Sequence, residues 1–156
     1  MSVIQRVYSY GNSGVGLGGL LAAERCGIKT YGFVPLGFIT DKGPQLILGD
    51  RFGLIEYNGA WAAKNIDDSD ATILLSDDAA SNKTKEVSDY CRSKGKPCIT
   101  LGLMDGEVDA CLLFLSLTRP SSVNIVGDID SGLGGVTKAA RDLLVDIFSA
   151  YRTEHS

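Results

Sequence analysis

Three segments of this chain have the composition of turns that bind a small anion. The first, residues 10–19, reads YGNSGVGLGG and follows a short apolar run near the start of the chain. The second, residues 76–84, and the third, residues 127–135, also follow apolar runs. Backbone N–H groups at such turns can bind phosphate or carboxylate oxygens, above all where a helix begins. The alternative for each segment is a tight turn or a capped loop without a ligand.

In the first segment, Gly11, Gly14 and Gly16 allow a tight turn and a close approach of the backbone to a ligand. Ser13 can cap a helix or donate a hydrogen bond to an oxygen. A G-x-G-x-x-G pattern begins at Gly14, as in dinucleotide-binding proteins. The acidic residue that such proteins need about 20 positions later is missing, because VPLG stands at residues 34–37. The pattern is therefore weak support for NAD binding.

The second segment combines helix-capping residues with charged side chains. Lys83 offers a positive charge to an anion, while Asn82 and Thr84 can cap a helix and donate hydrogen bonds. Two carboxylates, Asp77 and Asp78, disfavour a phosphate group at the same place. They could instead accept hydrogen bonds from ribose hydroxyls or from the edge of a base.

Short apolar strands alternate with longer helices along the chain. Strands are expected at 3–10, 29–34, 54–57, 71–76, 97–101 and 122–126, and helices at 17–26, 60–67, 82–94, 108–117 and after residue 135. Residues 36–53 are rich in Gly, Pro and Asp and predict a loop with at most a short helix. This alternation predicts an α/β, Rossmann-like fold with a mainly parallel sheet and helices on both faces. One ligand-binding domain would span residues 1–156, with residues 152–156 as a disordered tail.

All three segments fall at strand-to-helix turns, on one edge of the predicted sheet. Ligands of such sheets bind beyond the carboxyl ends of the strands, around the switch in strand order. The third segment resembles an anion cradle with Ser131 among its glycines, although Asp128 and Asp130 oppose a bare phosphate unless they contact hydroxyls. Because all three segments lie at this edge, they are not expected to be flexible tethers, and we predict that they form one ligand cleft.

Composition excludes several other kinds of site. The only histidine, His155, lies beside the C-terminus, which disfavours Ser-His-Asp, Cys-His and His-metal chemistry. Four cysteines without a CxxC pair predict reduced, partly buried thiols and no structural zinc. The net charge of −4 and the absence of a basic stripe disfavour nucleic-acid binding. No apolar run approaches 18 residues and no signal peptide is recognised, so we expect a cytoplasmic protein that does not enter membranes.

Several motifs together resemble a known family. GNSGVG at residues 11–16, GFVPLG at 32–37 and NIDDSDATI at 65–73 form an ordered series, which GKP at 95–97 and NIVG at 124–127 extend. The chain resembles the molybdenum cofactor carrier proteins, within the Rossmann-like group that includes the lysine-decarboxylase-like (LOG) nucleotide hydrolases. This resemblance implies a Rossmann-like fold, assembly into a homo-oligomer (dimer or tetramer), and a nucleotide- or molybdopterin-type ligand at the glycine turns.

The chain departs from the family pattern at its first turn. The family's turn reads Gly-Gly-Gln-Thr-Gly, followed by a small residue, Asp and Arg. Here Asn12 and Ser13 replace Gln-Thr, while Gly16 and Leu17 replace Asp-Arg. The backbone cradle is kept and the charged side chains are lost, which favours holding a ligand over transforming it.

A second departure concerns the hydrolase glutamate. Of the family's Gly-Gly-Thr turn, only Thr84 is kept at residues 82–84. The hydrolases carry a glutamate three residues after that threonine, where this chain has Val87. Glu86 lies one residue earlier, which rotates it by about 100° around a helix. A carboxylate directed away from a substrate cannot act as a general acid or base.

We therefore expect non-catalytic binding of a small phosphorylated ligand, either a nucleotide-like signal or a molybdopterin-type cofactor, by a carrier, sensor or sequestering protein. One alternative is a nucleoside monophosphate phosphoribohydrolase or related N-glycosidase that uses Glu86 or Asp77. Another is a structural module that oligomerises through the apolar helix at 108–117. The candidate ligand-binding residues are Gly11, Asn12, Ser13, Gly14, Val15, Gly16, Pro35, Gly37, Asn65, Ser76, Asp77, Asn82, Lys83, Thr84, Gly127, Asp128, Ser131, Gly132, Gly134 and Gly135.

Overall fold

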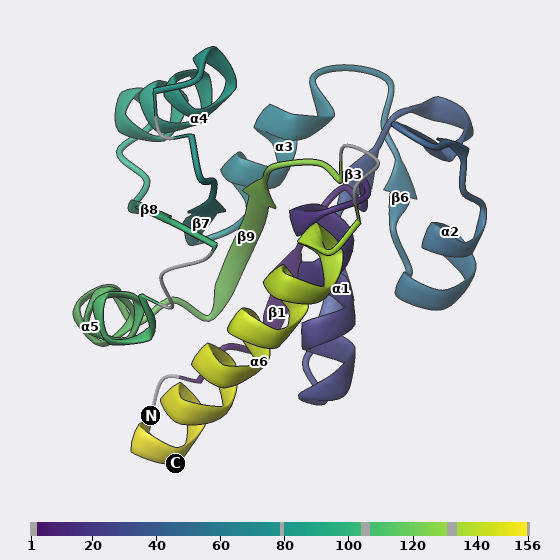
Figure 1. The fold of residues 1–156 in the computed structure, drawn as a ribbon. Helices are drawn as coiled ribbons and strands as arrows, with labels where there is room; N and C mark the ends of the chain where they lie inside the picture. Colours follow the sequence, from purple (N-terminus) through teal and green to yellow (C-terminus); the bar gives the residue numbers. More distant parts are fainter. Residues whose placement is uncertain (1–2, 79, 104–106, 131–133, 156) are drawn as a thin grey trace.

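The chain folds around one parallel sheet (Figure 1), shown by a computed structural model that describes residues 3–78, 80–103, 107–130 and 134–155. In chain order the elements are β1 (Arg6–Tyr8), α1 (Val15–Arg25), β2 (Lys29–Tyr31), β3 (Phe33–Val34), the 3-10 helix η1 (Leu36–Phe38), β4 (Ile39–Thr40), β5 (Gly43–Pro44), α2 (Ile47–Phe52), β6 (Ile55–Glu56), α3 (Trp61–Asp68), β7 (Ala71–Leu75), α4 (Asn82–Ser93), β8 (Cys98–Leu101), α5 (Val108–Thr118), β9 (Ser122–Gly127) and α6 (Val136–His155).

Five strands form the main sheet in the order β2-β1-β9-β7-β8, and every neighbouring pair is parallel. The apolar strands β7 and β9 are neighbours inside the sheet, in a register that sets Ile73 opposite Ile125. All five residues of β7 are buried, as expected for a parallel strand covered on both faces. The predicted fold class is confirmed.

Helices cover both faces of this sheet. On one face, Val7, Ile73 and Ile125 pack with buried residues of α1, α5 and α6 in the main hydrophobic core. On the other face lie α3 and α4, and Cys91 of α4 contacts Thr72 of β7. Figure 1 shows α1 and α6 side by side, with α4 and α5 at the opposite end of the molecule from α2.

The strand order is that of a Rossmann sheet whose last unit has been displaced. If β9 and α6 preceded β1, the strands would be numbered 3-2-1-4-5 across the sheet, which begins the standard Rossmann order. From β9 the sheet continues outward through β1 and β2, and from β7 it continues in the opposite direction through β8. Open α/β sheets bind ligands at such a switch point, so the topology places the expected site beyond the carboxyl ends of these two strands.

Glycines of the first segment bring α1 close to its neighbours. A Cβ atom on Gly18 would lie 2.7 Å from the carbonyl oxygen of Thr137 in α6, and one on Gly19 would lie 2.8 Å from Cγ2 of Ile125 in β9. Such distances leave no room for a side chain. These two glycines of YGNSGVGLGG thus serve helix packing.

The stretch between β2 and α3 is more regular than the predicted loop. It contains η1, the antiparallel β4–β5 hairpin, α2, and a small parallel pair formed by β3 and β6. Leu48 and Phe52 of α2 join Leu20 of α1 in a second hydrophobic core. Contacts with α1 thus stabilise a segment whose Gly- and Pro-rich composition predicts little structure on its own.

Two further boundaries differ from the sequence-based expectation. The second strand is divided at Gly32, where φ is 151° and a Cβ atom would lie 1.8 Å from the carbonyl oxygen of Ser9. Helix α6 continues through residues 152–155, where a disordered tail was expected, and Arg152 donates a hydrogen bond to the carbonyl oxygen of Cys26. Within the described residues, no helix is long and apolar enough to cross a membrane.

Candidate functional site

An open cleft of about 760 Å³ lies at the switch point between β7 and β9. Leu74 and Val126, near the carboxyl ends of these strands, form part of its floor, and α3 and the first turns of α4 form walls. The sequence-predicted residues that line it are Asn12, Asp77, Asn82, Lys83, Thr84, Gly127 and Asp128. The structure thus brings parts of all three turn segments together at one cleft.

The N-terminal turn of α4 is capped by its own side chains. The hydroxyl of Ser81 accepts a hydrogen bond from the N–H of Thr84 at 3.2 Å and contacts the Thr84 hydroxyl at 2.8 Å. Asn82 and Lys83 are exposed at the rim, and among the described residues no acceptor contacts their backbone N–H groups. These N–H groups and the Lys83 ammonium could together bind one anionic group.

Two carboxylates in the cleft hold the strand ends together. Asp128 accepts hydrogen bonds from the Ser76 hydroxyl at 2.7 Å and from the Asp77 N–H at 3.1 Å. Asp77 in turn accepts a hydrogen bond from the N–H of Leu103 at 2.9 Å, through Oδ1. Ser76 and Asp128 therefore join the end of β7 to the end of β9. Among the described residues no donor contacts Oδ2 of Asp77, so this oxygen could face a ligand.

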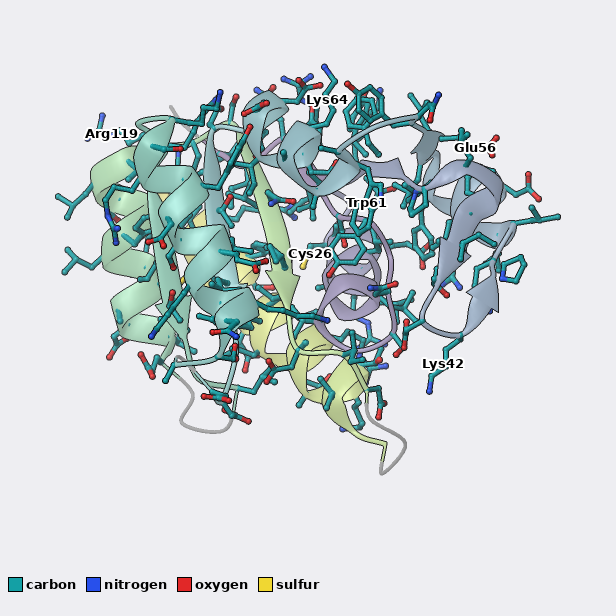
Figure 2. The ribbon with its side chains drawn as sticks, turned by 90° about the horizontal axis from the view of Figure 1, so that it is seen from above. Cys26, Lys42, Glu56, Trp61, Lys64 and Arg119 are labelled. Atoms are coloured by element: carbon teal, nitrogen blue, oxygen red, sulfur yellow. The ribbon has the colours of Figure 1, made fainter. Side chains whose placement is uncertain are left out.

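One wall of the cleft is aromatic, which the sequence-based site did not include. The rings of Tyr10 and Trp61 lie 4.6 Å apart between centroids and are tilted by 52°. Figure 2 shows Trp61 between α3 and α1. Burial raises the pKa of the Tyr10 hydroxyl above its usual value, so it stays protonated near neutral pH. A planar ring could stack on this wall.

The start of α1 does not offer the empty anion cradle that the first segment predicted. The carboxylate of Asp41, at the turn of the β4–β5 hairpin, accepts hydrogen bonds from the N–H of Ser13 at 2.8 Å and from the Ser13 hydroxyl. The N–H of Asp41 donates to Oδ1 of Asn12 at 3.1 Å. A side chain of the protein thus occupies the position expected for a ligand oxygen.

The next N–H groups of this turn also bond within the protein. Gly14 donates to the hydroxyl of Thr137 at 2.7 Å, and Val15 donates to the carbonyl oxygen of Asp128 at 2.9 Å. A Cβ atom on Gly14 would lie 2.3 Å from that same carbonyl oxygen. Gly11 and Gly16 are buried beside Leu48 and Ser9, respectively. The glycines let the first turn pack against the segment that follows β9.

Comparison with known proteins identifies the family. The profile of the circularly permutated YpsA SLOG family (cpYpsA) matches residues 7–148. The chain belongs to this family. The displaced β9–α6 unit agrees with a circularly permutated member of a Rossmann-like group. Among curated proteins, no sequence matches significantly.

A solved structure supports the fold of this cpYpsA family member. A proposed molybdenum carrier protein from Syntrophus aciditrophicus SB superposes with a TM-score of 0.81 at 21% sequence identity. The alignment covers 94% of this chain and 96% of that protein. At this level of identity the likeness establishes the common fold, and with the family match it bears out the resemblance read from the motifs.

Residues of the NIDDSDATI motif at 65–73, one of the motifs behind the family resemblance, have structural roles in this cpYpsA family member. The side chain of Asn65, which is buried, accepts a hydrogen bond from the N–H of Phe33 at 2.7 Å and donates to its carbonyl oxygen at 3.1 Å. Asp70 accepts three hydrogen bonds from residues 121–122. Lys96 donates to carbonyl oxygens of residues 67 and 69. These contacts tie α3 to β3 and the start of β7 to the start of β9.

The remaining predicted residues lie outside the cleft lining or outside the described residues. Gly37 donates its N–H to Glu56 at 2.5 Å and, like Pro35, does not line the cleft. Gly134 and Gly135 are exposed before α6. Ser131 and Gly132 fall outside the described residues.

The position of Glu86 differs from the sequence-based argument. Both Glu86 and Val87 line the cleft in this cpYpsA family member. Glu86 is exposed at the rim. An open cleft can be lined by residues from more than one face of a helix.

The cleft is acidic overall. In the part of the chain that the structure describes, its ionisable lining comprises the carboxylates of Asp77, Asp78, Glu86 and Asp128, the ammonium group of Lys83 and the phenol of Tyr10. Among the described residues, no group of three or more His, Cys, Asp or Glu side chains could hold a metal ion. Among the described lining residues, Lys83 is the only Lys or Arg.

Proposed function

We propose that the protein is a non-catalytic binding protein for a small phosphorylated ligand with a planar ring, of the nucleotide or molybdopterin type. It would act as a carrier, a sensor or a sequestering protein. The observation that carries this proposal is the pairing, in one cleft, of the Tyr10–Trp61 wall with the N-terminal turn of α4. The ring would stack on the wall, and the phosphate would lie at Asn82 and Lys83.

The charges of the cleft favour one phosphate group over several. The described residues that line it carry four carboxylates and one ammonium group, so each further phosphate would add repulsion. The start of α1, where a second phosphate could bind, is occupied by Asp41. A monophosphate is therefore the best match.

The hydrogen bonding of the acidic residues supports binding without catalysis. Asp128 uses both carboxylate oxygens to hold Ser76 and Asp77, and Asp77 uses one to hold Leu103. A general acid or base must be within reach of the reacting atom and exchange protons with it. Carboxylates committed to the scaffold are poorly suited to that role.

Isothermal titration with AMP, adenosine and a phosphorylated pterin tests this proposal. We expect a monophosphate to bind, and adenosine to bind roughly tenfold more weakly than AMP if AMP is accepted, because a charge-assisted contact of about 1.4 kcal/mol is lost. Lys83→Ala should weaken phosphate-dependent binding by a similar factor. Lys85→Ala is the matched control, since Lys85 lies two residues further along α4 and does not line the cleft. Equal losses in the two variants, or no binding of any monophosphate, would contradict the proposal.

One observation favours a second function. Because Glu86 lines the cleft, a nucleoside monophosphate phosphoribohydrolase remains the alternative. Incubation with AMP, GMP and other monophosphates would release free base in that case, and Glu86→Gln would abolish the release. Intact monophosphates after prolonged incubation would exclude this activity for the compounds used.

We also propose that the protein forms a homo-oligomer. Helix α5 buries Cys111 and Leu115 against the core, but Leu113 and Leu117 on another face are 61% and 75% exposed. Contact with a second copy would remove this apolar surface from water. Light scattering coupled to gel filtration should give a multiple of 16.6 kDa, and Leu117→Glu should lower it. A monomer at micromolar concentration would contradict this proposal.

A further inference from the structure

Two thiols face each other on the side of the sheet that α4 covers. The side chains of Cys91 in α4 and Cys98 in β8 are neighbours, and both are free thiols. The Thr72 hydroxyl of β7 contacts Cys91 as well. Cys91 is fully buried and Cys98 is half-buried, so solvent approaches the pair from Cys98. The proposed ligand site does not use either thiol.

The backbone around the pair is held in place independently of the sulfur atoms. The N–H of Lys96, two residues before Cys98, donates to the carbonyl oxygen of Cys91 at 2.9 Å and holds the turn that follows α4 against the last turn of the helix. Cys98 is registered opposite Thr72 in the parallel β7–β8 pair. The two cysteines therefore approach through a short, ordered turn.

The pair also differs chemically from the other cysteines. The neighbouring Cys98 thiol lowers the pKa of Cys91 against the opposing effect of burial, and the Thr72 hydroxyl and Lys96 lower it further, whereas the same pairing and burial raise the pKa of Cys98. Burial alone raises the pKa of Cys111 to about 12. Thiolates are the reactive form of cysteine toward oxidants, and redox-sensitive thiolates often lie beside a second cysteine.

We propose that Cys91 and Cys98 are a redox modification site that forms a reversible disulfide when the protein meets hydrogen peroxide. The Cys91 thiolate attacks one peroxide oxygen, the O–O bond breaks, and the departing hydroxide takes up the proton released by Cys91 to form water. The resulting sulfenic acid is attacked by the sulfur of Cys98. An S–S bond forms, and the hydroxyl leaves with the Cys98 proton as a second water. Two thiols and one peroxide thus give one disulfide and two waters.

The disulfide would join the last turn of α4 to the edge strand β8. A thiol reductant such as glutathione reverses it by exchange, so the site would respond to the balance of oxidant and thiol. This inference concerns the cysteines alone and does not depend on the ligand proposed for the cleft.

The test uses the intact protein in its folded form. It is exposed to a moderate excess of hydrogen peroxide for minutes, remaining thiols are blocked with N-ethylmaleimide, and fragments are analysed by mass spectrometry. We expect a cross-linked product that contains Cys91 and Cys98, lighter by two hydrogens than the reduced pair and lost after treatment with dithiothreitol. Cys98→Ser should abolish it, and Cys98→Ala serves as a second variant if the serine protein is unstable.

Cys26→Ser is the matched control. Cys26 is half-buried like Cys98, but its sulfur contacts a hydroxyl, that of Ser149 at 3.9 Å. This variant should still form the disulfide. The proposal would be overturned if Cys91 and Cys98 were both recovered alkylated, if they were oxidised to sulfinic acid without a cross-link, or if Cys26 were required for the product.

Discussion

At the scale of single residues, Asp41 has the clearest consequence for stability. Its carboxylate satisfies the N–H and hydroxyl of Ser13 at the start of α1. We expect Asp41→Ala to lower the free energy of unfolding by about 1 kcal/mol, as for the loss of a helix-capping side chain. Urea denaturation measures this. Lys42→Ala, at the neighbouring exposed position, should have little effect, and equal losses would show that the Asp41 contacts contribute nothing.

Asp70 predicts a dependence of stability on pH. Burial acts to raise its pKa, but hydrogen bonds from Ser121 and Ser122 outweigh this effect and lower the pKa below its usual value. A lowered pKa in the folded state contributes stability above the unfolded-state value of about 3.9, and this stability is lost as the pH falls through the folded-state pKa.

The variant Asp70→Asn should therefore be less stable than the natural protein at pH 7. The difference between the two should shrink as the pH falls through the lowered folded-state pKa of Asp70, where the carboxyl of the natural protein becomes protonated. Urea denaturation between pH 2.5 and 7 tests this expectation. A difference that stays constant across this range would show that the charge of Asp70 plays no part.

At the scale of elements, the packing of α1 against α6 depends on glycine. We expect Gly18→Ala to destabilise the protein by about 1–3 kcal/mol, although alanine favours a helix, because its Cβ would meet the backbone of α6. In Gly16→Ala the nearest atom is the Ser9 hydroxyl oxygen at 3.2 Å, so the cost should be smaller. Thermal denaturation compares the two. A more stable Gly18→Ala protein would contradict the observed packing.

The same elements show how far the sequence predicts the structure. Alternating strands and helices indicated the parallel sheet, and three turn segments indicated the edge where the cleft lies. The roles within the first segment were not predictable, because Asp41 and Thr137, which bond to Ser13 and Gly14, lie 28 and 123 residues away along the chain. Trp61 was also missed, since a single aromatic residue at the start of a polar helix gives no local sign of its partner Tyr10.

At the scale of the whole molecule, the strand order predicts that the protein will still fold after a further circular permutation. Val3 and Ile4 line a small pocket together with Phe148, Tyr151 and Arg152, so the two ends of the chain lie close together. A permutant that begins at residue 119, with the original ends joined by a short Gly-Ser linker, would have strand order 3-2-1-4-5.

We expect this permutant to fold with the same circular dichroism spectrum and the same ligand response. Its new termini fall between α5 and β9, where no strand or helix of the fold is interrupted. A permutant without a cooperative thermal transition would show that the connection between α5 and β9 is essential to the fold.

The central claim is that a ring-bearing monophosphate binds between the aromatic wall and α4. Trp61 is the only tryptophan of the chain and belongs to that wall, so its fluorescence reports on the cleft directly. Titration with AMP and with a phosphorylated pterin is the most direct measurement. We predict a saturable change in Trp61 fluorescence with at least one of them, shifted to roughly tenfold higher concentration in Lys83→Ala and unshifted in Lys85→Ala. Unchanged fluorescence with every monophosphate, in folded protein, would contradict the claim.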